Sequence, residues 1–131
     1  MNRYELREQM FKMLFRTEFH EKEELGEQLS FFFDELDQKE EADVDYLDGK
    51  FRDIAEHLPQ IDEMINETAK GWKTSRMGKV DLTLIRLAVY EMKFEEDIPT
   101  GVAINEAVEL AKRYGTDDSA AFVNGILAKL V

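Results

Sequence analysis

The segment 80–94, VDLTLIRLAVYEMKF, constrains the fold of this chain more than any other stretch does. It contains no Gly or Pro and consists mostly of residues with good helix propensity. On a helical wheel its apolar side chains cover nearly the whole circumference and leave one narrow polar strip, formed by Thr83, Arg86, Tyr90 and Lys93. A helix that is apolar nearly all round must be covered by other elements on most of its sides. The segment therefore predicts a central helix within a helical bundle.

The length and composition favour one all-α domain. At 131 residues the chain can bury a substantial core, and no stretch shows the strict alternation of a half-buried strand. The absence of cysteine excludes disulfide bonds and thiolate ligands. Neither a signal-peptide pattern nor an apolar run of membrane-spanning length occurs, so we expect a cytoplasmic protein that does not enter a membrane.

Apolar periodicity and end signals predict about seven helices. Pro59 suits the first turn of a helix, while Gly71 and Gly115 suit positions just after helix ends. We expect a single domain over residues 1–131, with two small bundles over about 1–57 and 58–131. The predicted helices cover approximately residues 4–19, 22–37, 43–58, 59–70, 80–94, 102–114 and 119–130.

The first predicted helix carries more apolar surface than one packing face needs. Its polar face includes Glu8 and Lys12, and its apolar arc covers roughly two thirds of the circumference. Arg3 and Arg7 fall on the apolar side. Two interpretations remain open. Either part of the arc faces a binding partner, or the two arginines lie at the edge of the core with their aliphatic stems buried.

The formal net charge of −12 is distributed unevenly along the chain. Residues 1–16 have a net charge of +2, residues 17–68 have −14, and residues 69–131 are neutral overall. We expect the acidic side chains of the middle segment to form a solvated outer face. Because the two flanking segments can still present a basic surface, the net charge does not exclude an RNA ligand.

The stretch 70–79, KGWKTSRMGK, contains four basic residues and no acidic one. Since Trp72 lies among these cations, the stretch is suggestive of a nucleic-acid patch. The other interpretation is a connector to the central helix, with Trp72 anchored in the core. We favour the connector.

No pattern of catalytic or metal-binding residues is present. His20 and His57 lack the spacing of a bundle metal site, and the chain has no phosphate-binding loop or nucleophile elbow. Glu91 has apolar neighbours on the wheel, which indicates a carboxylate in a structural role rather than a catalytic one. We therefore expect a protein that is not an enzyme and that needs no cofactor or metal.

The second half of the chain contains several ordered motifs, namely Trp72-x3-Arg76, VDLTLIRLAVYEM (80–92), Ile98-Pro99, VAINEAVELAKRYG (102–115) and Ser119-x2-FVNGIL (122–127). In this order and at these separations they resemble the motifs of the bacterial transcription antitermination factor family NusB. The resemblance is dense over about residues 70–130 and loose over 1–68.

The resemblance implies an all-α fold of two helical bundles and a non-enzymatic, RNA-binding role. Members of the family pair with NusE, a small-subunit ribosomal protein. Together they hold the single-stranded boxA element of ribosomal RNA leaders near RNA polymerase and suppress premature termination. The positions of this chain that match the family's RNA face are Arg3, Arg7, Asp118 and Phe122, and those that match its partner face are Phe15, Phe19 and Asp81.

Two of these residues have competing structural roles. Phe122 starts an apolar stripe of the last helix, so it either stacks on a base or packs in the core. Asp118 either contacts RNA or caps that helix. Tyr4 and Glu5 interrupt the basic N-terminal cluster, which puts the strength of RNA binding without NusE in doubt.

Two other functional classes remain. The same fold is appended to RNA methyltransferases, although this chain leaves no room for their catalytic domain. The stronger alternative is a homodimeric protein-interaction module that does not bind RNA.

Overall fold

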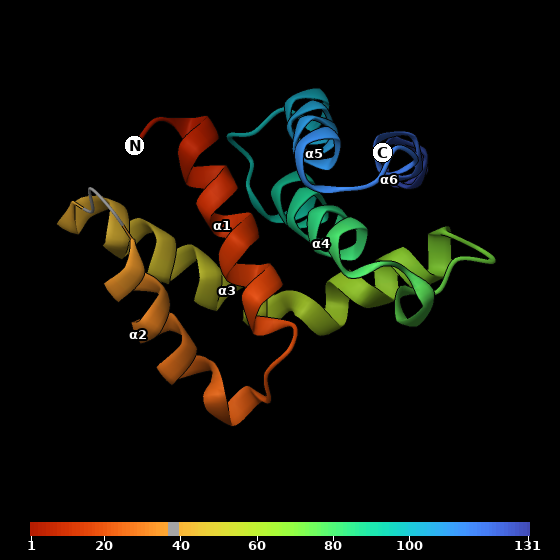
Figure 1. The fold of residues 1–131 in the computed structure, drawn as a ribbon. Coiled ribbons are helices and arrows are strands. Elements are labelled where there is room, and N and C mark those ends of the chain that lie inside the picture. The colour runs from red at the N-terminus through yellow and green to blue at the C-terminus, as the bar shows by residue number, and fades with distance from the viewer. Residues whose placement is uncertain (37–39) are drawn as a thin grey trace. The chain divides into compact units, whose positions relative to one another are not determined.

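The computed structural model describes residues 1–36 and 40–131. Over these residues the chain is helical and contains no β-strand, which confirms the all-α prediction. None of the described helices is long and apolar enough to span a membrane. The elements are α1 (Arg3–Thr17), η1 (Lys22–Glu24), α2 (Leu25–Glu35), α3 (Glu41–Thr68), η2 (Thr74–Arg76), α4 (Lys79–Phe94), α5 (Thr100–Tyr114) and α6 (Ser119–Ala128) (Figure 1).

The chain forms two compact units, Met1–Ala55 and Glu56–Val131. In the first unit α1 packs against α2. The start of α1 is closed by a capping box, in which Asn2 Oδ1 accepts a hydrogen bond from the Glu5 N–H and Glu5 Oε1 accepts one from the Asn2 N–H. The apolar core of this unit consists of Met10, Phe11, Met13, Leu14, Leu29, Phe32, Leu47, Phe51 and Ile54.

The single helix α3 corrects the prediction of two helices that meet at Pro59. Pro59 lies inside α3, although an interior proline removes one backbone hydrogen bond and costs about 3 kcal/mol. The buried residues Ile54 and Ile61 flank it at a spacing of seven residues. The apolar stripe thus crosses Pro59 without a change of phase, and the continuous helix buries side chains on both sides of the proline. The predicted acidic connector between the second and third helices falls partly on residues 37–39, which lie outside the described part of the chain.

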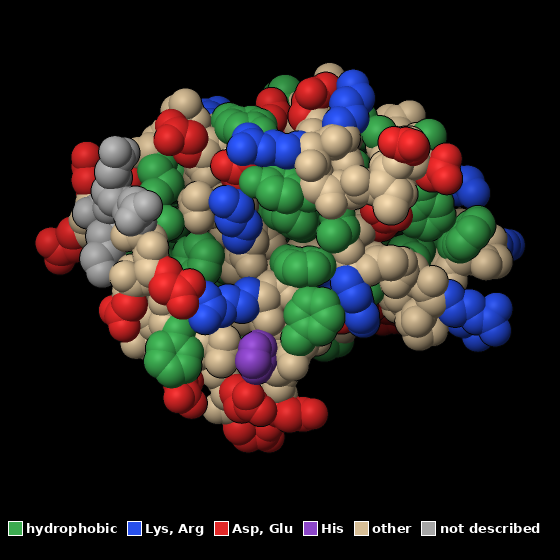
Figure 2. All heavy atoms as spheres, in the orientation of Figure 1, with side chains coloured by type: hydrophobic (Ala, Val, Ile, Leu, Met, Phe, Trp, Pro, Cys, Tyr) green, Lys and Arg blue, Asp and Glu red, His purple; other side chains and the backbone are tan. Residues whose placement is uncertain are grey.

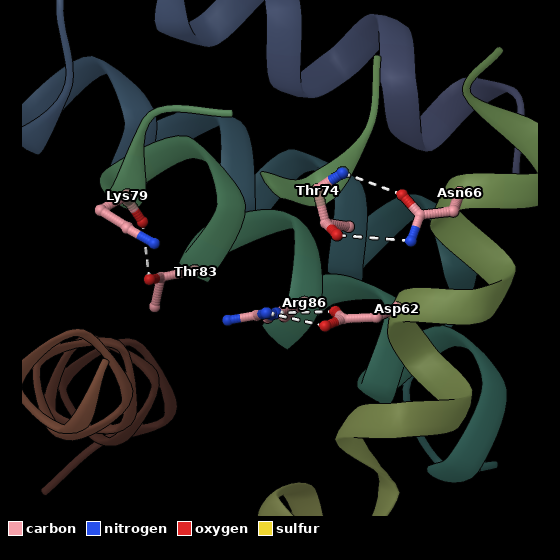
Figure 3. Close-up of polar contacts among 6 residues, drawn as sticks. All are labelled: Asp62, Asn66, Thr74, Lys79, Thr83 and Arg86. Atoms are coloured by element: carbon pink, nitrogen blue, oxygen red, sulfur yellow. Dashed lines mark hydrogen bonds and ion pairs between the residues drawn. The ribbon is translucent and has the colours of Figure 1, made fainter. Parts of the chain in front are cut away.

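In the second unit α4 packs against α5 and α6, which also pack against each other (Figure 1). The predicted enclosure of segment 80–94 is confirmed, because its apolar side chains from Leu82 to Val89 are all buried. Thr83 and Tyr90, from the predicted polar strip, are buried as well. The Thr83 hydroxyl donates a hydrogen bond to the Lys79 carbonyl at 2.7 Å, which compensates for its burial (Figure 3).

Two further polar side chains of α4, Arg86 and Glu91, are held within the fold. Arg86 donates two hydrogen bonds to the Asp62 carboxylate of α3, from Nε and Nη2, each at 2.8 Å (Figure 3). This bidentate ion pair joins α4 to α3 with fixed geometry. Glu91 is 1% exposed, as expected for a structural carboxylate. No buried side-chain nitrogen or oxygen lacks a hydrogen-bond partner anywhere in the described part of the chain.

Candidate nucleic-acid and protein interfaces

The N-terminal half of α1 holds the two arginines assigned to RNA. Arg3 lies in the first turn and is exposed. Arg7, one turn later, is only 8% exposed and is already engaged in a contact with other residues. Glu8 is also buried, so its assignment to the polar face is wrong. Arg3 is therefore the better placed of the two cations to meet a phosphate.

A pocket of about 530 Å³ lies beside this half of α1. Four of its lining residues are Glu5, Glu8, Glu35 and Glu40. Their like charges oppose the entry of a phosphate, so the pocket does not suit a nucleic-acid backbone. The nearby Asp43 carboxylate accepts a hydrogen bond from the Met1 amine at 2.9 Å and thereby raises the pKa of that amine.

A ladder of three phenylalanines at a spacing of four residues runs from Phe11 and Phe15, in the C-terminal half of α1, to Phe19 in the turn just after its end. The ring centroids of Phe11 and Phe15 are 5.9 Å apart, and those of Phe15 and Phe19 are 5.2 Å apart in an edge-to-face arrangement. Along this ladder exposure rises from the buried Phe11 to Phe19, which is 60% exposed. Two of the predicted partner-binding residues, Phe15 and Phe19, are thus in direct contact and present an apolar surface to solvent.

The end of α1 is also fixed to α2. Arg16 Nη1 donates a hydrogen bond to Glu35 Oε2 at 2.9 Å, and Arg16 Nε donates one to Gln28 Oε1 at 3.1 Å. These contacts hold the last turns of α1, which carry Phe15 and lead directly to Phe19.

The third predicted partner-binding residue, Asp81, lies in the first turn of α4 in the second unit. Its carboxylate forms no hydrogen bond or ion pair with another described residue. A negative charge in the first turn of a helix interacts favourably with the helix dipole, and the Asp81 side chain is half-buried.

The start of α6 carries Asp118 and Phe122. The Asp118 side chain is exposed and makes no capping hydrogen bond, so the capping interpretation is wrong. The corner before α6 is closed instead by Ser119, whose Oγ accepts a hydrogen bond from the Thr116 N–H at 2.9 Å. Phe122, predicted as part of the buried stripe, is only half-buried. The backbone bond from the Phe122 N–H to the Asp118 carbonyl places the two residues one helical turn apart.

A contact that the sequence interpretation missed brings Trp72 against Phe122. Their ring centroids are 5.1 Å apart with an interplanar angle of 72°. Trp72 is 51% exposed, so the favoured prediction of a tryptophan anchored in the core is wrong. The buried anchor of this connector is Met77. The available signal was Trp72 itself, standing among cations in the stretch 70–79.

The arrangement as a whole offers binding surfaces. Within residues 1–36 and 40–131, no three His, Asp or Glu side chains are grouped so that they could hold a metal ion. The exposed functional side chains are instead cations, acids and aromatic rings, which recognise phosphates, bases and apolar protein surfaces through non-covalent contacts.

Comparisons with known proteins agree with this picture. The NusB family profile matches residues 4–131. The transcription antitermination protein NusB of Agathobacter rectalis is 59% identical over 129 residues, covering 98% of both chains. The corresponding protein of Lachnoclostridium phytofermentans is 53% identical over 131 residues, covering 100% of this chain and 99% of the relative.

Two solved structures share the fold. T. maritima NusB superposes with a TM-score of 0.88 at 40% identity, covering 99% of this chain and 90% of that one. The NusB chain of a crystal structure of the antitermination factors NusB and NusE in complex with double-stranded RNA has a TM-score of 0.83 at 26% identity. In that comparison the matched region covers 99% of this chain and 97% of the other. By its sequence and its structure, this chain belongs to the NusB family.

Proposed function

We propose that this protein is a non-catalytic transcription antitermination factor that binds boxA-type RNA of ribosomal RNA leaders together with NusE. The observation that carries the proposal is the match to the NusB family over residues 4–131. It is supported by the likeness to a NusB chain that was crystallised with NusE and RNA. In this role the protein acts in the cytoplasm, on RNA polymerase during elongation, as one NusB-like domain over residues 1–131.

The proposed RNA contacts are Arg3, Arg7, Asp118 and Phe122. Arg3 is exposed and supplies a phosphate contact, whereas Arg7 contributes from its engaged, buried position. Phe122 is half-buried, and its exposed part is proposed to stack on a base. Because Asp118 repels phosphates, it suits a hydrogen bond to a base or a sugar hydroxyl rather than a contact to the RNA backbone.

The proposed NusE contacts are Phe15, Phe19 and Asp81. The exposed end of the phenylalanine ladder provides an apolar anchor, as expected for the centre of a protein interface. Asp81 adds a negative charge in the first turn of α4. A basic partner such as a ribosomal protein complements this charge.

The test is a binding titration of the full chain with a single-stranded boxA-type RNA, with and without NusE. The control RNA has the same composition and a shuffled boxA. We expect NusE to tighten binding and the boxA RNA to bind more tightly than the shuffled RNA. Equal affinity for both RNAs, with no effect of NusE, contradicts the proposal. A salt-insensitive dimer that ignores RNA, measured by light scattering, supports the homodimeric interaction module instead.

A further inference from the structure

The loop between α3 and α4 combines cations with an exposed aromatic ring. Lys70, Lys73 and Arg76 are all exposed, and none forms an ion pair with another described residue. Residues 70–79 contain no acidic side chain that could neutralise them locally. Figure 2 shows Lys and Arg side chains beside hydrophobic ones at the right-hand edge, where the chain turns after α3 in Figure 1. The loop is therefore a site of positive potential next to apolar surface.

The backbone of this loop is held in place without a ligand. The Thr74 N–H donates a hydrogen bond to Asn66 Oδ1 at 2.8 Å, and Asn66 Nδ2 donates one to Thr74 Oγ1 at 3.4 Å (Figure 3). Gly71 turns the chain with a φ of 88°, a conformation that strongly favours glycine, and Met77 is buried at the other end. A preformed loop loses less conformational entropy when it binds than a flexible one does.

Trp72 and Phe122 together form an aromatic surface on this loop. Their edge-to-face contact fixes the indole, yet 51% of Trp72 stays exposed. A held and exposed aromatic ring suits stacking with a planar ligand, and the neighbouring cations indicate that the ligand is anionic.

Single-stranded nucleic acid has both properties. Its unpaired bases stack on aromatic side chains, and its phosphates meet lysine and arginine, whereas a duplex hides its base faces. Asp117 and Asp118 precede Phe122 and repel phosphates from the start of α6. The phosphate backbone is therefore expected to run along residues 70–76, with a base turned toward the rings.

We propose that Trp72 and Phe122 form a stacking platform for an unpaired base of bound RNA, with Lys70, Lys73 and Arg76 on the adjacent phosphates. This inference rests on the proposed RNA-binding function and adds a contact site to it. The site extends the RNA contacts beyond the α1 arginines and the start of α6.

Affinity titrations of the full chain with NusE and a single-stranded boxA-type RNA test the platform. We expect Trp72→Ala to weaken RNA binding about 5-fold or more without changing the salt dependence, since stacking releases no counterions. Trp72→Phe keeps a ring and is expected to lose less. Phe31→Ala removes another exposed aromatic ring and is the matched control, with wild-type affinity expected.

The cations are tested by the double variant Lys73→Ala/Arg76→Ala. Two lost phosphate contacts should lower the magnitude of the log–log salt slope by about 1.4, at roughly 0.7 for each contact to a single strand. Lys112→Ala/Lys129→Ala removes the same charge from two exposed positions of the second unit and is expected to leave the slope unchanged.

Trp72 is the only tryptophan of the chain, so its emission reports the contact directly. We expect RNA, at concentrations high enough to saturate the weak binding without NusE, to quench this emission in the wild-type protein. Thermal melts show whether each variant is folded. If Trp72→Ala does not fold, the RNA affinity of Trp72→Phe and the wild-type emission decide whether Trp72 contacts RNA.

The outcomes separate the platform from the wider function. If the wild type binds RNA, but Trp72→Ala binds equally well and the emission does not change, the platform is wrong and the proposed function stands. If the wild type binds no RNA even with NusE, both are wrong. If Trp72→Ala loses NusE binding but keeps its RNA affinity, the ring contacts protein and the platform is overturned.

Discussion

Phe19 exposes an apolar ring that the core of its own unit does not use. Since this side chain is 60% exposed, Phe19→Ala should change the free energy of unfolding by less than about 1 kcal/mol. If the phenylalanine ladder is the NusE surface, the same change should weaken NusE binding by about 2 kcal/mol or more. Calorimetric titration with NusE and denaturant melts measure the two effects. Phe15→Ala should weaken NusE binding as well, at a larger cost in stability, because Phe15 is less exposed.

Phe31→Ala is the control for this prediction. Phe31 is also an exposed phenylalanine, but it lies on α2 outside the ladder, and its loss should leave NusE binding unchanged. Equal losses of NusE affinity in the α1 and α2 variants would show that α1 carries no specific NusE surface.

Gly115 is required by a close approach and not by its backbone conformation. Its φ of −95° is open to any residue, but an added Cβ would collide with Ser119 Oγ and Cβ and lie 2.8 Å from the Ala111 carbonyl. Gly115→Ala should therefore lower the free energy of unfolding by about 1–3 kcal/mol, the usual cost of overpacking. Thermal or denaturant melts measure this change.

Gly125→Ala is the control for Gly115→Ala, and its expected effect on the free energy of unfolding has the opposite sign. It lies within α6, where an added Cβ meets no other atom within 4 Å. Gly125→Ala should stabilise the protein by roughly 0.5–1 kcal/mol, because alanine loses less conformational entropy in a helix. If Gly115→Ala and Gly125→Ala both stabilised the protein, Ser119 would be able to move away from residue 115 without a loss of stability.

The helix α4 tests how well the second unit is packed. Leu87 is 2% exposed, so Leu87→Ala should leave a cavity and lower the free energy of unfolding by about 2–5 kcal/mol. The exposed Lys93 of the same helix should tolerate alanine within about 0.5 kcal/mol. Denaturant melts that gave a loss below about 1 kcal/mol for Leu87→Ala would mean that α4 is not enclosed.

The proline inside α3 is expected to lower the stability of this helix. Pro59 is exposed within the helix, and Pro59→Ala restores a backbone donor where a hydrogen bond is missing. We expect this variant to be more stable in denaturant melts, by up to about 3 kcal/mol. The neighbouring exposed residue Gln60 serves as the control, since Gln60→Ala changes helix propensity only slightly. A loss of stability in Pro59→Ala would indicate two helices instead of one.

The charge of the protein governs how it binds RNA. With a net charge of −12, the chain repels polyanions at long range, and 13 of its 17 lysines and arginines lie in the two segments that flank the acidic one. RNA binding should therefore be weak for the protein without NusE, and tight and steeply salt-dependent in the complex. In the complex, Arg3→Ala should reduce the magnitude of the log–log salt slope by about 0.7, because Arg3 is exposed.

Two further variants check the assignment to Arg3. Lys22→Ala removes the same charge from the acidic segment and should leave the salt slope unchanged. Arg7→Ala should lower the stability of the protein more than Arg3→Ala does, because Arg7 is buried and engaged. Identical salt slopes for the wild type and Arg3→Ala would show that Arg3 does not contact an RNA phosphate.

Local periodicity was sufficient to predict the helices that carry the candidate site. A helix repeats every 3.6 residues, so α1, α4 and α5 can be recognised from neighbouring residues alone. The same signal predicted that α4 is enclosed and that α1 has surplus apolar surface. The prediction of two helices on either side of Pro59 was wrong, because the apolar stripe continues through the proline and its burial outweighs the lost backbone hydrogen bond.

Local periodicity could not predict the burial and the contacts of individual side chains. Trp72 and Phe122 are separated by 50 positions in the chain, and their contact arises from the folding of residues 56–131, which include the C-terminal part of α3, into one unit. Glu8 is buried and Asp118 is exposed. Both properties likewise depend on whether elements distant in the sequence pack over the side chain. Helix formation is a property of adjacent residues, whereas burial and aromatic contacts are properties of packing between distant ones. The local sequence therefore determines where helices form, whereas burial and aromatic contacts are decided only by the tertiary structure.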